Sequence, residues 1–156
     1  MDQIMDWVQQ AKRLFGMPKP EHFNNYRHCC ECAEHDEILR LHDVDTIGLK
    51  QLRHAGSDPL CGVSPEGFKY YLPALVRLTL ESIDHPAFFY GDQLLFHLTW
   101  DGEQNHHFLA CTPKQRAFIA QFLEYLIETY AKAFDYGMSA CQLLQAHDIW
   151  SQTLTH

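Results

Sequence analysis

The stretch that decides the fold is residues 112–126, TPKQRAFIAQFLEYL. Thr112 is a residue that accepts a hydrogen bond at a helix N-terminus, Pro113 suits the first helical position, and Gln115 stands where a capping box needs it. Apolar residues then return every three or four positions, which is the spacing of a helix with one buried face. The stretch predicts a long helix that begins after Thr112 and continues to about Phe134.

Similar signals predict helices along the rest of the chain. Apolar residues recur at helical spacing in residues 2–15. Ser64 and Pro65 mark the start of a helix that contains Pro73, where we expect a kink. Further helices are expected over residues 26–41, 46–52 and 139–150, and Asn24 or Asn25 is the expected N-cap of the first of these. The sequence thus predicts a mainly α-helical protein, a compact bundle of five to six helices forming a single domain over residues 1–156.

The sequence of residues 94–111 is compatible with two different structures. Asp101 and Gly102 lie between two apolar runs and would suit the turn of a β-hairpin with strands near 94–100 and 106–111. The run DQLLFHLTW also fits a buried helix, because a short apolar run does not settle the period. We favour the helix and keep the hairpin as an addition to the bundle.

The composition excludes several classes of partner. The chain has 12 basic and 20 acidic residues, and its formal net charge is -8. This charge argues against binding to a nucleic-acid backbone, which requires a basic face. No apolar run reaches the roughly 18 residues that a membrane-spanning helix needs, and the first residues do not form a signal peptide. We expect a cytoplasmic protein with neither a nucleic-acid nor a membrane partner.

Residues 28–35, HCCECAEH, hold three of the six cysteines and two of the eleven histidines. On a helix, three of these side chains share one face and a fourth lies at its edge. Thiolate and imidazole are common ligands of tetrahedral zinc. The candidate ligands are His28, Cys29, Cys32 and His35, with Cys61 in a later loop as the expected further ligand. The alternatives are a structural helix whose cysteines act as small hydrophobes, and redox chemistry.

Enzyme motifs are scarce in this sequence. It contains no nucleophile elbow, Walker loop, Rossmann glycine motif or HExxH. A metal-dependent hydrolase is the minority interpretation, in which His42 and Asp43 would join Asp148 and a histidine of the 28–35 segment. The pattern therefore favours a protein that is not an enzyme.

Two segments resemble a group of small, uncharacterised bacterial proteins. The group shares a Phe-x-Tyr-Tyr-Leu-Pro-Ala segment and a later helix that begins with Gln-Arg. Here those positions are Phe68, Tyr70, Tyr71, Leu72, Pro73, Ala74, Gln115 and Arg116. The resemblance covers roughly half of the chain and implies a bacterial, cytoplasmic, non-catalytic protein. Small acidic bacterial proteins of this kind are similar to immunity proteins, which bind and neutralise a toxin enzyme.

The leading hypothesis is a non-enzymatic, acidic protein-binding module of the immunity or antitoxin type. A toxin with a basic surface, such as a nuclease, would be attracted by carboxylates and anchored by exposed aromatic rings. The residues expected to contact it are Asp84, Phe88, Phe89, Tyr90, Asp92, Asp101 and Glu103, with Trp100 as a further anchor. The alternative is a zinc-binding protein or zinc-dependent enzyme centred on residues 28–35.

Overall fold

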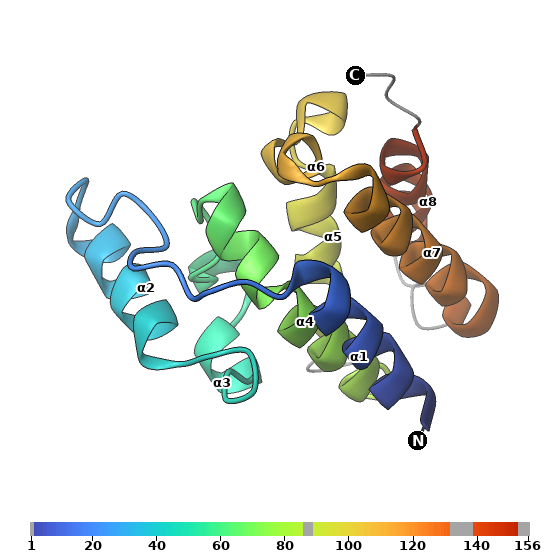
Figure 1. The fold of residues 1–156 in the computed structure, drawn as a ribbon, viewed down its shortest axis with the longest axis horizontal. Helices are drawn as coiled ribbons and strands as arrows, with labels where there is room; N and C mark the ends of the chain where they lie inside the picture. Colours follow the sequence, from blue (N-terminus) through green and yellow to red (C-terminus); the bar gives the residue numbers. More distant parts are fainter. Residues whose placement is uncertain (1, 86–88, 132–138, 153–156) are drawn as a thin grey trace. The chain divides into compact units, whose positions relative to one another are not determined.

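The computed structural model describes residues 2–85, 89–131 and 139–152. Within these ranges the chain forms eight α-helices and two short 3-10 helices, and no β-strand (Figure 1). The predicted mainly α-helical fold is confirmed. The helices outnumber the predicted five to six partly because two of them have only four and five residues. The β-hairpin considered for residues 94–111 is not formed.

The chain divides into two compact units, Met1–Leu78 and Thr79–His156. The first unit contains α1 (Asp2–Phe15), α2 (Cys30–Leu41), α3 (Leu49–Leu52), η1 (Ala55–Ser57) and most of α4 (Pro65–Glu81). The second contains α5 (Gly91–Thr99), η3 (Gly102–Gln104), α6 (His106–Ala110), α7 (Pro113–Tyr130) and α8 (Ser139–Trp150). The single domain predicted for residues 1–156 stays a prediction. Among the described residues, no helix has both the length and the apolar character needed to cross a membrane.

The capping box at the start of α7 forms as predicted. Thr112 Oγ1 accepts the backbone N–H of Gln115 at 3.2 Å, and Gln115 Oε1 accepts the N–H of Thr112 at 2.9 Å. The first helix also matches its predicted range, Asp2–Phe15. The predicted end of the long helix near Phe134 lies outside the described residues. Helix α8 begins at Ser139 itself.

The second helix begins four residues later than predicted, at Cys30. Cys29 has an extended backbone, and its Sγ accepts the N–H of Cys32 at 3.4 Å, so a cysteine occupies the N-cap position. Asn24, one of the two predicted caps, instead donates its side-chain amide to the carbonyl of Cys32 at 3.0 Å. His28 therefore precedes the helix and does not share a helical face with later residues.

Asp101 and Gly102 reverse the chain between two helical segments. Both residues have left-handed backbone conformations, with φ values of 65° and 56°. Two successive residues with positive φ are also what a tight β-hairpin turn requires. The Asp-Gly signal is therefore used for a turn as the sequence suggests, but helices α5 and α6 flank it in place of strands.

A buried carboxylate fixes the chain before α2 in the first unit. Asp36 is 2% exposed. Its Oδ1 accepts the backbone N–H of Phe23 at 2.7 Å, and its Oδ2 lies 2.7 Å from His22 Nδ1. The far end of the helix is held by Tyr71, whose hydroxyl donates to the carbonyl oxygens of Leu39 and His42. The middle and the C-terminal end of α2 are thus attached to other parts of the unit.

Helix α8 packs against α5 and α7 in the second unit (Figure 1). The indole N–H of Trp150 donates to the carbonyl of Leu98 at 2.9 Å, and its ring meets Phe108 edge-on at 5.2 Å. The buried side-chain amide of Asn105 holds the turn between α5 and α6. Asn105 donates to the carbonyls of His97 at 2.9 Å and Trp100 at 2.8 Å, and it accepts the N–H of Phe108 at 3.0 Å.

Candidate functional site

The thiol cluster consists of His28, Cys29 and Cys32. Their ligand atoms all lie within 4.8 Å of one another. The two Sγ atoms are 3.4 Å apart, and Cys32 Sγ lies 3.7 Å from His28 Nδ1. Within residues 2–85, 89–131 and 139–152, this is the group of three or more such side chains whose donor atoms converge. It presents two sulfurs and one nitrogen from a segment of five residues.

The two thiols of the cluster differ in acidity. The backbone N–H of Cys32 pointing at Cys29 Sγ is the largest cause that lowers the pKa of Cys29 to about 7, followed by hydrogen bonds from the side chains of His28 and Cys32. The pKa of Cys32 is raised, chiefly by its hydrogen bond to Cys29. Near neutral pH, Cys29 is therefore the thiol that more readily carries negative charge.

The structure does not bring the two other predicted ligands into the thiol cluster. His35 is buried on α2, and its Nε2 lies 4.0 Å from Glu31 Oε1. Cys61 lies in the loop before α4, where burial first, and then the charges of Asp58 and Glu31, raise its pKa. Of the five predicted metal ligands, three thus lie together in the structure and two lie elsewhere.

Asp43, one of the two acidic residues of the hydrolase interpretation, has a local role. Asp43 Oδ1 accepts the backbone N–H of Asp45 at 2.8 Å and that of Thr46 at 2.9 Å. These hydrogen bonds lower the pKa of the Asp43 carboxyl. The Asp43 side chain closes the turn after α2, so its sequence position is explained without catalysis.

A row of exposed side chains lies along α5. Asp92, Phe96 and Trp100 are four residues apart, and residues with this spacing lie on one side of a helix. Phe96 is 47% exposed and Trp100 is 53% exposed. The N–H of Trp100 donates to the carbonyl of Phe96 at 3.0 Å, so the helical turn extends to the tryptophan. Exposed Asp101 and Glu103 follow it. We call these five residues the α5 face.

All four carboxylates expected at the partner surface are exposed. Asp84, Asp92, Asp101 and Glu103 all face solvent. The aromatic residues expected there are less exposed than the carboxylates. Phe89 is half-buried and Tyr90 is 1% exposed, while Phe88 lies outside the described residues. Tyr90 is therefore not available as an exposed anchor.

Sequence reasoning missed the second aromatic ring of the α5 face. Phe96 was part of an apolar run whose structure was left open, so its spacing of four from Trp100 was not used. That spacing is the signal that would have found it once the segment was taken as helical. Leu109 and Leu144 are also exposed apolar residues of the second unit that no motif indicated, at 47% and 55%.

Negative charge is concentrated in the unit that carries the α5 face. Residues 79–156 contain nine acidic and three basic side chains, whereas residues 1–78 contain eleven acidic and nine basic ones. Six of the eight net negative charges therefore belong to the second unit. An approaching cation or basic protein is attracted by this unit more strongly than by the first.

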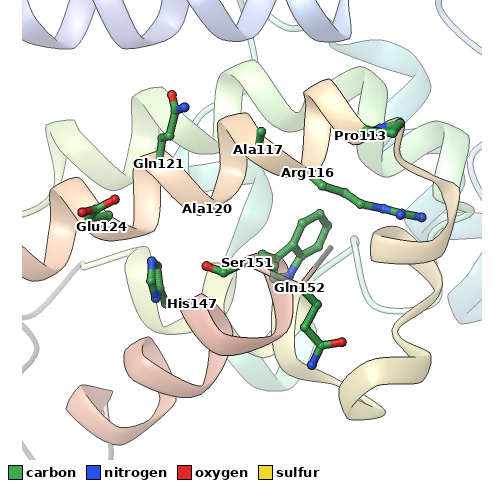
Figure 2. Close-up of a pocket in the computed structure, with 10 residues that line it drawn as sticks. Pro113, Arg116, Ala117, Ala120, Gln121, Glu124, His147, Ser151 and Gln152 are labelled. Atoms are coloured by element: carbon green, nitrogen blue, oxygen red, sulfur yellow. The ribbon is translucent and has the colours of Figure 1, made fainter. Parts of the chain in front are cut away.

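A pocket of about 380 Å³ lies between α7 and α8 in the second unit. Glu124 and His147 lie toward one end, and Arg116 and Gln152 toward the other (Figure 2). Arg116 donates to the carbonyl oxygens of Phe108 at 2.8 Å and Leu109 at 3.2 Å. The Arg116 guanidinium thus caps the C-terminal end of α6. The positive charge beside this pocket therefore has a structural role.

These features define a class: an α-helical protein that combines an exposed cysteine and histidine cluster with a strongly acidic second unit. The chain belongs to the family of unknown function DUF6714, whose model matches residues 15–153. The resemblance to an uncharacterised family is confirmed at this level. No curated protein and no solved structure matches the chain.

Proposed function

We propose that this chain is a non-enzymatic, cytoplasmic protein-binding module that neutralises a bacterial toxin with a basic surface. The α5 face is the contact region. The observation that carries the proposal is the exposure of Phe96 and Trp100, at 47% and 53%, next to exposed carboxylates. Large aromatic rings at the centre of an interface commonly supply most of its binding energy.

The geometry of Trp100 suits an anchor because its position is fixed while its ring is exposed. Its carbonyl accepts a hydrogen bond from buried Asn105 at 2.8 Å, and its ring meets the edge of His106 at 5.7 Å. A side chain that is already positioned loses less conformational freedom when it binds. The tryptophan therefore enters an interface at a reduced entropic cost.

The charge of the second unit supports a basic partner. Asp92, Asp101 and Glu103 border the two rings, and complementary charge accelerates association between proteins. A nuclease toxin carries a basic surface because it must hold nucleic acid. An acidic inhibitor that covers this surface would block the substrate, as immunity proteins do, to which this chain is analogous in its small size and acidic charge.

The test is co-expression with the product of an adjacent gene that arrests growth when expressed alone. We expect the wild-type chain to restore growth and to bind the purified toxin. Phe96→Ala combined with Trp100→Ala should weaken binding by more than about tenfold, because both anchors are removed. Full rescue and unchanged affinity in this double variant would exclude the α5 face as the contact region.

A matched pair of charge variants separates local from overall electrostatics. The first carries Asp92→Asn, Asp101→Asn and Glu103→Gln in the second unit. The second carries Asp6→Asn, Glu21→Gln and Glu37→Gln, three exposed acids of the first unit. We expect only the first to slow association at low salt and to flatten its salt dependence, measured by stopped-flow mixing. Equal slowing in both variants would mean that net charge alone steers the encounter.

A further inference from the structure

The thiol cluster lies in the first unit and is independent of the α5 face. Its three donors come from one segment, in which His28 and Cys29 precede the first turn of α2 and Cys32 lies within it. Asn24 holds this turn from outside through the carbonyl of Cys32 at 3.0 Å. The donors are therefore positioned by the backbone, and they remain accessible because His28 and Cys29 are exposed.

Two of the three distances between the donors are close to the edges of a tetrahedral metal site. With zinc–sulfur bonds of about 2.3 Å and zinc–nitrogen bonds of about 2.0 Å, a tetrahedron has a sulfur–sulfur edge of about 3.8 Å and a sulfur–nitrogen edge of about 3.5 Å. The cluster has a sulfur–sulfur distance of 3.4 Å and a sulfur–nitrogen distance of 3.7 Å. The third edge, from Cys29 Sγ to the His28 imidazole, is within 4.8 Å, so adjustment of these exposed side chains would bring all three donors onto one ion.

We propose that His28 Nδ1, Cys29 Sγ and Cys32 Sγ bind a borderline-soft divalent cation, zinc in the cell. Each thiol that binds releases its proton to solvent, and the imidazole binds in its neutral form. The carboxylate of Glu31, between the two cysteines in the chain, acts electrostatically on Cys32 and adds negative charge beside the cation. Three protein ligands leave the fourth tetrahedral position to a water molecule, as in exchangeable sites.

This arrangement differs from a site that braces α2 against the loop of Cys61. In the described structure Cys61 is not part of the group whose donors converge. The proposed site is local, and its removal should leave the helices in place. Serine is a preferred N-cap residue, so Cys29→Ser removes a thiolate donor and keeps an oxygen that accepts the N–H of Cys32.

The experiment uses the full chain without a histidine tag, fully reduced and kept free of oxygen. Titration with Co²⁺ should give a thiolate-to-cobalt charge-transfer band and intense visible bands of tetrahedral cobalt, saturating at one equivalent. Zn²⁺ should displace the cobalt. Cys29→Ser and Cys32→Ser should each lower the cobalt affinity by more than about tenfold, since each removes one of three ligands. His28→Ala should shift the visible bands and weaken binding.

Two cysteine variants serve as controls. Cys30 is exposed and adjacent to Cys29 but does not belong to the cluster, so Cys30→Ser should bind cobalt like the wild type. Cys61→Ser should behave in the same way. Circular dichroism of every variant checks that the helices are retained. The melting temperature of the wild type should rise on adding Zn²⁺, and that of Cys32→Ser should rise much less.

Three results would overturn the proposal. One is the absence of a cobalt charge-transfer band in the fully reduced protein. Another is a loss of binding in Cys30→Ser or Cys61→Ser as large as that in Cys32→Ser. The third is a cluster that forms a disulfide between Cys29 and Cys32 but does not hold zinc. In that case the reduced protein would bind less than about a tenth of an equivalent of zinc.

Discussion

The two units of this chain expose different chemistry. Residues 1–78 carry nine of the twelve basic side chains and the thiol cluster, whereas residues 79–156 carry a large excess of acids and the α5 face. The overall charge of -8 therefore describes neither unit. It averages a nearly balanced half with a strongly acidic half, and arguments about an attracted partner apply to the second.

The units also differ in how they hold their candidate sites. In the first, a buried carboxylate, Asp36, binds the backbone of Phe23 in the segment that leads to the thiol cluster. In the second, a buried neutral amide, Asn105, binds the carbonyl of Trp100. A buried polar side chain thus binds the backbone in or near each exposed site. Substitutions at these two positions compare a charged support with a neutral one.

The largest effect is expected for Asp36→Ala. The substitution leaves the buried N–H of Phe23 without its acceptor and removes the partner of His22, so we expect a loss of about 3 kcal/mol in the free energy of unfolding. Urea denaturation measures it. Glu37→Ala, at the exposed neighbouring position, should change the stability by less than about 0.5 kcal/mol. Similar values for the two variants would show that the carboxylate is not a structural support.

Asn105→Ala should have the second largest effect. It removes three hydrogen bonds between the amide and buried or half-buried backbone groups, and we expect a loss of about 2 kcal/mol. The loss should be smaller than for Asp36→Ala because the amide is uncharged. Gln104→Ala, at the exposed preceding position, is the control for urea denaturation. A larger loss of stability for Asn105→Ala than for Asp36→Ala would contradict the expectation that the charged side chain is the stronger support.

We expect His107, in the second unit, to make the stability of the protein depend on pH. Burial, and then the charges of His97 and His106, lower the pKa of His107 from 6.5 to about 3. Below pH 6.5 the unfolded chain binds a proton at this position and the folded chain does not, so stability is lost as the pH falls toward 3. This contribution amounts to about 1.4 kcal/mol between about pH 7.5 and about pH 5.5.

The pH effect is measured by urea denaturation of the wild type and of His107→Gln across this range. The variant should lose less stability on acidification, because glutamine does not titrate. His85→Gln, at an exposed histidine that is not among the groups lowering the pKa of His107, should retain the wild-type pH dependence. Parallel curves for the wild type and His107→Gln would contradict the lowered pKa.

The smallest effect is expected at an exposed ion pair of the first unit. Lys12 Nζ lies 2.6 Å from Asp45 Oδ1, and both side chains are well exposed. Exposed pairs contribute little, so Lys12→Ala should destabilise the protein by about 0.5 kcal/mol or less, and the difference should shrink in high salt. Lys50→Ala is the surface control, because Lys50 is exposed and forms no ion pair within the described part of the chain. A loss above about 1 kcal/mol would show that first-unit charges contribute more than exposed pairs usually do.

The helices that sequence predicted well are those with local stop and start signals. Thr112 and Gln115 specify the start of α7 by their own side chains, and Gly16 follows the end of α1. The resemblance positions also proved structural, since Arg116 closes α6 and Tyr71 holds the end of α2. The boundaries of α1 and α7 are predictable because the groups that decide them are close in sequence or repeat at a clear period.

The parts that sequence did not predict depend on contacts between distant groups. The start of α2 was missed because Asn24, a good cap by residue type, was used to hold the carbonyl of Cys32, and the weaker capping residue Cys29 took its place. Phe96 was missed because an Asp-Gly turn fits both a hairpin and a helical corner. Of the candidate metal ligands, the three nearest in sequence meet, whereas the expected approach of Cys61 required a tertiary contact that spacing does not encode.

The cysteine that caps α2 connects sulfur chemistry to the backbone. Cys29 Sγ accepts the amide hydrogen of Cys32, so whatever occupies that sulfur changes how the amide is shielded from water. Alkylation, oxidation or a bound ion would each alter the rate at which the Cys32 amide hydrogen exchanges with deuterium. A single exchangeable hydrogen at the start of a helix thereby becomes a built-in reporter of the chemical state of one side chain.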